Sequence, residues 1–204
     1  MEFTDNNNHT ELMGTVEDLP LFSHEIYGEA FYLFMLSVER LSGTSDHIRV
    51  IASERLLKSC EIVAGDKISV IGQFRSYNAV GDGANKLILS VFARDIITDE
   101  SHRLQNPNSL YLNGFVCKPP VYRTTPFGRE ICDLLLAVNR TYNKSDYIPI
   151  ITWGRNARFC RDLDVGTNIR VWGRIQSRVY QKKLENDEYI EKTAYEVSVS
   201  RLEI

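Results

Sequence analysis

The sequence predicts an all-β protein built from two tandem copies of one small five-stranded barrel, each copy with a short helix between its third and fourth strands. Two observations support this prediction. Residues recur at a fixed offset of one hundred positions, and apolar residues alternate with polar ones through most of each copy. A fixed offset is the signature of a duplicated unit, and alternation is typical of strands with one buried face.

The repeat is clearest in two pairs of segments. HIRVIASERLLKSC (47–60) lies one hundred residues before YIPIITWGRNARFC (147–160), and LMGTV (12–16) lies one hundred before LNGFV (112–116). A chain of 204 residues accommodates two domains of about 100 residues each. We expect a disordered polar leader at 1–9, a first copy at 10–98, a linker at 99–108 and a second copy at 109–204.

Alternation and turn residues define five strands and one helix in the second copy. The expected strands are Leu110–Val116, Arg129–Arg140, Tyr147–Trp153, Thr167–Lys182 and Tyr189–Arg201, and one or two helical turns are expected around residues 157–160. This is the element order of an OB-fold barrel. A five-stranded barrel of another topology is the alternative.

The two copies differ in charge. Residues 1–104 carry 9 Lys and Arg against 16 Asp and Glu, whereas residues 105–204 carry 15 against 11, so the halves have net charges of −7 and +4. A basic half in an acidic protein indicates that the second copy alone meets a polyanion. Chance variation between two solvated surfaces is the alternative.

The sequence gives no sign of a metal site, a cofactor or a membrane helix. Its four cysteines and four histidines are scattered without ligand spacing. No window holds the roughly 18 apolar residues that a membrane helix needs, and the first residues form no secretory signal. We expect no cofactor and a cytoplasmic protein with reduced, buried cysteines.

The fourth strand of the second copy predicts a ligand-binding face. Alternation turns Ile169, Val171, Ile175 and Val179 inward, and it turns the neighbouring arginines and rings outward. Interleaved rings and guanidinium groups are suited to single-stranded nucleic acid, since rings stack on bases and arginines contact phosphates. The alternative for each ring is a place in the core or in a protein interface. The outward residues are Arg170, Trp172, Arg174, Gln176, Arg178 and Tyr180, with Lys182 at the base of the hairpin.

The first copy lacks most of these side chains. Trp172 and Tyr180 correspond to Ile71 and Ala79, and the third-strand rings are also replaced, Tyr147 by His47 and Trp153 by Ser53. We therefore expect the first copy to bind nucleic acid weakly.

The second copy resembles the bacterial single-stranded DNA-binding protein (SSB) family. The resembling segments are the opening N-x-L-x-L-x-G, the proline-containing turn, the AVNR run and the Y-I-P-I-I-T-W-G run, over about 90 residues in all. The first copy resembles the family more distantly.

The resemblance implies site residues and an assembly. Base-stacking rings would fall on Tyr142, Tyr147, Trp153 and Tyr180, and phosphate contacts would fall near Arg123, Arg140, Arg155, Arg174 and Arg178. Family members commonly work with four barrels, so two barrels per chain imply a homodimer here. The resemblance to DNA-binding proteins also implies that the protein is associated with the bacterial nucleoid. The resemblance also implies replication or repair proteins as partners, although the acidic C-terminal tip through which the family recruits them has no counterpart in this sequence.

The predicted function is non-enzymatic binding of single-stranded DNA, largely independent of sequence, in replication, recombination or repair. One alternative is a protein-interaction module of a replication, primosome or conjugation assembly, which the acidic first copy favours. Another is an RNA-binding OB protein. No catalytic motif stands out, and we expect the duplicated Asp46 and Asp146 to shape turns.

Overall fold

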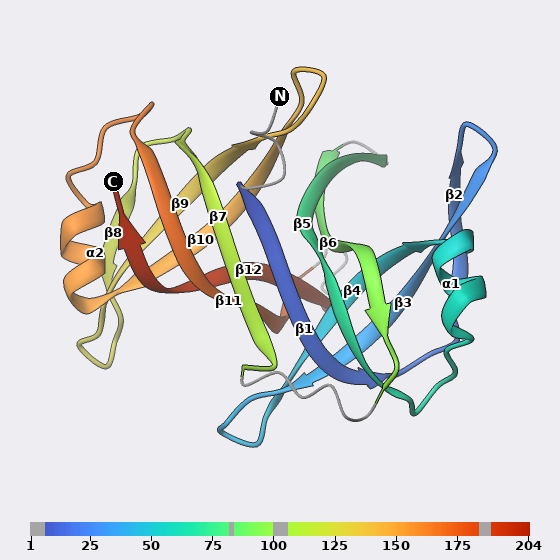
Figure 1. Ribbon diagram of the computed structural model, residues 1–204. Helices are drawn as coiled ribbons and strands as arrows, with labels where there is room; N and C mark the ends of the chain where they lie inside the picture. The colour runs from blue at the N-terminus through green and yellow to red at the C-terminus, as the bar shows by residue number, and fades with distance from the viewer. Residues whose placement is uncertain (1–6, 82–83, 100–105, 184–188) are drawn as a thin grey trace.

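The computed structural model describes residues 7–81, 84–99, 106–183 and 189–204. The first barrel contains β1 (Asn8–Val16), β2 (Leu21–Ile26), β3 (Glu29–Glu39), β4 (Ser45–Ser53), α1 (Glu54–Cys60), β5 (Lys67–Gly81) and β6 (Ala84–Ile97). The second contains β7 (Asn108–Val116), β8 (Val121–Thr124), β9 (Glu130–Asn139), β10 (Ser145–Trp153), α2 (Gly154–Cys160), β11 (Asn168–Lys183) and β12 (Tyr189–Glu203). The two barrels lie side by side, with β1 and β7 between them (Figure 1).

Each barrel closes in the same way. Five strands follow the order β3-β4-β6-β5-β1, and β1 pairs again with β3; the second barrel repeats this with β9-β10-β12-β11-β7 and a β7–β9 pairing. The pairings β4–β6 and β10–β12 are parallel. This closure is that of the OB-fold, so the prediction of two tandem all-β OB-folds is confirmed.

Alternating aliphatic residues fill both barrels, as strands with one buried face require. In the first barrel Leu12, Leu36, Ile48 and Val70 are fully buried, and Leu112, Leu136, Ile148 and Val171 occupy the matching places in the second. The duplicated apolar positions of the sequence are thus the two cores.

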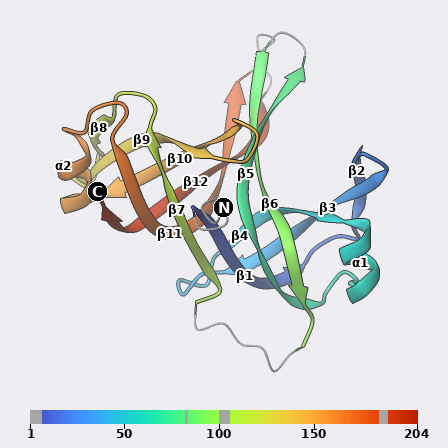
Figure 2. The same cartoon turned by 45° about the horizontal axis from the view of Figure 1, so that its top comes forward.

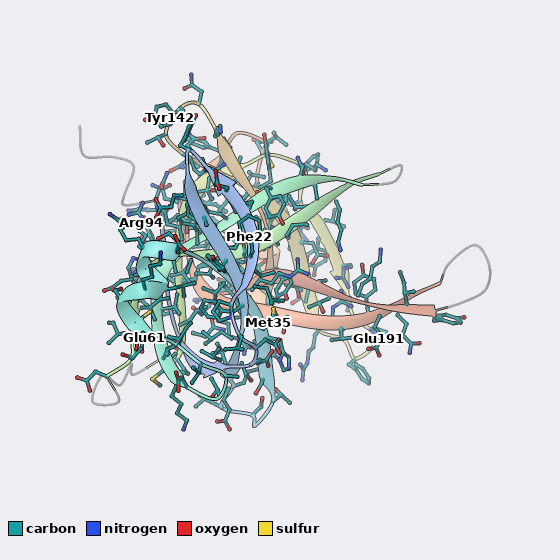
Figure 3. All side chains as sticks on the ribbon, turned by 90° about the vertical axis from the view of Figure 1, so that its right-hand side faces the viewer. Phe22, Met35, Glu61, Arg94, Tyr142 and Glu191 are labelled. Atoms are coloured by element: carbon teal, nitrogen blue, oxygen red, sulfur yellow. The ribbon has the colours of Figure 1, made fainter. Side chains whose placement is uncertain are left out.

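Two details differ from the sequence predictions. The loop expected after the first strand of each copy holds a further short strand, β2 or β8, which pairs with the start of β3 or β9. Val179, expected to point inward, is 58% exposed. It lies where β11 and β12 have left the barrel as a hairpin, so no core is beneath it. Figure 3 shows this hairpin extending from the body, with Glu191 on it.

The expected division into leader, copies and linker stays a prediction. β1 begins at Asn8, within the expected leader, and β7 begins at Asn108, at the last residue of the expected linker. Residues 1–6 and 100–105, where most of the leader and half of the linker fall, lie outside the described residues.

The barrels are joined through their first strands. β1 and β7 pair antiparallel from Asn8↔Leu112 to Leu12↔Asn108, which makes one continuous sheet with β2 and β8 at its two ends. Figure 2 shows the long hairpins β5–β6 and β11–β12 rising together beside this seam.

Buried aspartates tie the barrels together at the seam. The Asp46 carboxylate accepts a hydrogen bond from the Ser177 amide of the other barrel, and Asp146 accepts one from the Ser76 amide. Both aspartates are fully buried. The expectation that they shape turns is therefore wrong: each binds the backbone of the opposite barrel.

Candidate nucleic-acid interface

The outer face of the second barrel is built across five strands. Register places one residue of each strand in a single row, in which Ile151 is buried. The row is Val121, Asp133, Ile151, Ser198 and Arg174. Beside this row, the indole Nε1 of Trp153 donates a hydrogen bond of 3.3 Å to Ser198 Oγ. The ring is 38% exposed, so it is anchored at one edge and open to a ligand.

Trp153 stands at the junction of β10 and α2. It is the N-cap residue of α2, and its side chain makes no capping hydrogen bond. Its counterpart Ser53 accepts a hydrogen bond of 3.3 Å from the Leu56 amide and so caps α1. Because serine is a favoured N-cap and tryptophan is not, the second barrel carries a ring where the first carries a stabilising cap.

Two further predicted rings are exposed near the other end of β10. Tyr147 is exposed, and its backbone amide donates a 2.7 Å hydrogen bond to Ser76 Oγ of the first barrel. Tyr142 is almost fully exposed in the β9–β10 loop, where it and Asn143 both have positive φ. Figure 3 shows Tyr142 at a tip of the molecule.

Three of the predicted arginines are available to a ligand. Arg155 and Arg178 are exposed, Arg174 is half-buried in the central row, and no carboxylate among the described residues forms an ion pair with any of them. On the β11–β12 hairpin Tyr180 is exposed, whereas the side chain of Lys182 lies outside the described residues.

Other predicted polar residues are held by carboxylates. Arg123 Nε donates to Asp133 Oδ2 at 2.8 Å, and this bond raises the pKa of the Arg123 guanidinium. Gln176 donates to Glu196 at 3.0 Å. The Arg140 Nε lies 3.4 Å from Asp146 Oδ2, at the seam. Arg140 is thus part of the joint between the barrels rather than of the outer row.

Trp172 and Arg170 form a separate group toward β7. The Trp172 ring lies 5.1 Å from the ring of Tyr111 on β7, and the Arg201 guanidinium of β12 lies 4.6 Å from its centroid. Arg170 is 3.5 Å from Glu203, which also pairs with Arg201. The single continuous face predicted along β11 is therefore divided, and Trp172 is already packed against a ring and a cation.

Tyr111 and Arg201 did not emerge from the sequence. Strand alternation around the buried Leu110 and Leu112 would have placed Tyr111 outward. Arg201 depends on a register shift between Trp172 and Gly173, which a sequence pattern does not show.

The first barrel has a different surface at four of the five places in this row, and only Ile51 and Ile151 are the same. Its row contains Leu21, Leu33, Ile51, Phe92 and Gln73. Its rings pack on each other, since Phe31 lies 5.1 Å from His24 and 5.4 Å from Phe92. The Arg75 guanidinium lies 4.3 Å from the Phe92 centroid. These rings are packed against one another, with Phe31 buried and His24 and Phe92 half-buried.

The group around Trp172 is also replaced. The trio of Tyr111, Trp172 and Arg201 corresponds by register to Glu11, Ile71 and Asp95. Two rings and a cation in the second barrel thus become two carboxylates and an aliphatic residue in the first, which agrees with the charge asymmetry of the sequence.

The described residues gather no three His, Cys, Asp or Glu side chains that could hold a metal ion. Within the same residues, no helix has the length and apolar character to cross a membrane.

Comparison with known proteins agrees with this fold. Residues 107–204 match the Single-strand binding protein family. The chain is 36% identical over 83 residues to single-stranded DNA-binding protein 1 of Staphylococcus aureus (strain COL), covering 37% of this chain and 50% of that protein. It is 35% identical over 83 residues to single-stranded DNA-binding protein A of Bacillus subtilis (strain 168), covering 37% and 48%. The matched region thus spans about half the length of these relatives.

A solved structure reproduces the tandem arrangement. The wild-type single-stranded DNA binding protein of Thermus aquaticus superposes with a TM-score of 0.76 at 24% identity, covering 96% of this chain and 91% of that one. This likeness shows the fold. Residues 107–204 are thus similar to the single-strand binding protein family, and the whole chain has the tandem OB-fold of the Thermus aquaticus protein.

Proposed function

We propose that this protein binds single-stranded DNA, largely independently of sequence, mainly through the outer face of its second OB-fold. Bases would stack on Trp153, Tyr147 and the exposed tyrosines, and phosphates would meet Arg155, Arg174 and Arg178. Stacking is available to every base, and phosphate contacts carry no sequence information. Binding of this kind requires no catalysis and serves replication, recombination or repair.

One observation carries the proposal. Trp153 is an exposed indole held at one edge by Ser198 and placed beside a row that ends on Arg174. In the first barrel the same places hold Ser53 and Gln73. The names of the similar proteins support single-stranded DNA as the ligand, and a homodimer with four OB-folds on the bacterial nucleoid is the assembly we infer.

Titration with oligo-dT tests the proposal, because both tryptophans of the chain, Trp153 and Trp172, lie outside the cores. Tryptophan fluorescence should be quenched, and the quenching should weaken as salt rises because counterions are released on binding. Absence of quenching together with unchanged oligonucleotide anisotropy would refute DNA binding. Competition with a matched RNA oligonucleotide distinguishes DNA from RNA preference.

A role in protein interaction is a second candidate, and the first barrel favours it. Its outer face is apolar and acidic, with Leu21 and Phe22 exposed by 68% and 62%. A large apolar surface of this kind is typical of a protein contact.

A further inference from the structure

The two ends of the molecule carry matching hairpins. We call residues 17–29, which include β2, the first hairpin, and residues 117–129, which include β8, the second hairpin. β2 and β8 are the end strands of the continuous sheet, and they lie at opposite ends of the molecule (Figure 1). One backbone edge of each strand therefore has no neighbouring strand within the sheet.

The hairpins have opposite charge. The first hairpin carries Glu17, Asp18, Glu25 and Glu29 and no Lys or Arg. The second carries Lys118, Arg123 and Arg129 and no Asp or Glu. The same segment of the repeat has thus become wholly acidic in one barrel and wholly basic in the other.

Several of these charges are free of internal partners. Asp18 and Glu25 are exposed in the first hairpin, as are Lys118 and Arg129 in the second. Among the described residues none of these four forms an ion pair. Glu17 and Arg123, in contrast, are held by His47 and Asp133. The free charges point to a contact outside the chain.

Apolar side chains accompany the charges at both ends. The first hairpin exposes Leu21, Phe22 and Ile26, and the second exposes Val121 and Phe127. An exposed end strand with apolar side chains is a template for association unless something covers it. The second hairpin offers a strand of only four residues, so side chains rather than backbone pairing would supply most of such a contact.

We propose that the first hairpin of one chain docks on the second hairpin of another copy of this chain. Opposite charge decides the orientation, since acidic would meet basic and two like hairpins would repel. The two surfaces differ and lie at opposite ends, so the contact is heterologous and propagates head to tail. The proposal concerns these hairpins alone and does not rest on DNA binding.

Charge exchange between the hairpins tests the proposal. Asp18→Lys/Glu25→Lys makes the exposed, unpaired charges of the first hairpin basic like those of the second, and Lys118→Glu/Arg129→Glu makes those of the second hairpin acidic like those of the first. All four positions are exposed, so folding should persist. Sedimentation velocity of the full chain, without DNA, measures the weight-average mass against protein concentration at low and high salt.

The wild-type chain should gain mass with concentration beyond that of the homodimer inferred above, and high salt should reduce this gain, since exposed charges are screened over about 10 Å at 0.1 M salt. Each charge variant alone should lose this gain in mass. An equimolar mixture of the two variants should again gain mass with concentration, and so should the chain that carries all four substitutions. A control with an equal charge change elsewhere, Glu39→Lys/Glu191→Lys, should associate like the wild type.

Four results would overturn the proposal. The weight-average mass of the wild-type chain could fail to rise with concentration, or the mass of both variants could rise as that of the wild type does. A mixture that fails to recover growth would likewise show that these hairpins do not meet. If the control variant loses the rise in mass to the same extent, net charge alone governs association.

Discussion

The amide of Ser177 donates a 2.7 Å hydrogen bond to the carboxylate of Asp46, which lies on the opposite barrel. The duplicated counterpart is the 2.8 Å bond from the Ser76 amide to Asp146. The two joints are not equivalent, however. Asp46 also accepts two hydrogen bonds from Arg40, at 2.7 and 2.5 Å, whereas Asp146 has Arg140 only at 3.4 Å.

Asp46→Asn should destabilise the protein more than Asp146→Asn. The first substitution breaks a two-point bond to Arg40, and charged hydrogen bonds of this kind contribute about 1.5–3 kcal/mol each. The second keeps an acceptor for the Ser76 amide and loses only a long contact. Urea unfolding at neutral pH measures both differences, and equal losses would show that the two joints are energetically alike.

Asp146 should also make stability depend on pH. Burial raises its pKa above the ordinary aspartate value, more than the Ser76 amide and Arg140 lower it. The folded protein therefore binds a proton more readily than the unfolded chain, so the stability from this group is greatest below the ordinary pKa and declines as pH rises through the raised one. The stability advantage of the wild type over Asp146→Asn should shrink as pH rises above the ordinary aspartate pKa of about 4, as urea unfolding at several pH values would show. An advantage that grows with pH would contradict the raised pKa.

Trp153→Ala should weaken binding of oligo-dT more than Trp172→Ala. One base stack is worth about 1–3 kcal/mol, or about 5- to 150-fold in affinity. The Trp172 ring is packed against Tyr111 and Arg201 and has less surface to offer. Fluorescence anisotropy of labelled oligo-dT compares the variants, and the reverse order would place the main stack on the β7 side of the barrel.

Arg174→Gln should reduce the dependence of binding on salt. This change gives the second barrel the residue that the first has at Gln73. Each phosphate contact on a single strand contributes about 0.7 to the slope of log affinity against log salt. The slope should fall by about that amount, and Gln73→Arg should leave it unchanged. If Gln73→Arg steepens the slope instead, the first barrel also meets the DNA.

Ser53→Ala should lower the free energy of unfolding by about 0.5–1 kcal/mol without changing DNA binding. The hydroxyl caps α1 through the Leu56 amide, and loss of a serine cap costs about this amount. Ser59→Ala in the same helix, at an exposed position, is the control. Urea unfolding and anisotropy measure the two effects, and a loss of DNA affinity would assign Ser53 to a binding face.

The sequence predicted the repeat, the OB-fold and the helix positions because each is visible as a pattern of residue types along the chain. Alternation located β9–β12 to within a few residues, and the break after Trp153 located α2. The short strands β2 and β8 were missed because their Pro- and Gly-bearing segments have the composition of loops. Val179 was misplaced because alternation continues into the hairpin after the barrel has ended.

Contacts between distant segments could not be predicted from local patterns. Asp46 lies at the start of β4, next to a turn, and the pairing of β1 with β7 brings the opposite barrel, with Ser177, to it. The packing of Trp172 depends on strand register across three strands. The separation of Arg140 from the outer row follows from its place at the seam. Which of the predicted residues bind DNA stays a prediction.

The most direct test of the account gives the second barrel the surface of the first. Tyr147→His/Trp153→Ser/Arg174→Gln replaces two open rings and one free cation by their counterparts, and His47→Ala/Gln73→Ala is the control in the first barrel. Oligo-dT anisotropy should show a loss of affinity of about 25-fold or more for the first variant, as two stacks imply, and no loss for the control. Undiminished binding by the first variant, with its fold retained by circular dichroism, would contradict the assignment of DNA binding to the second barrel.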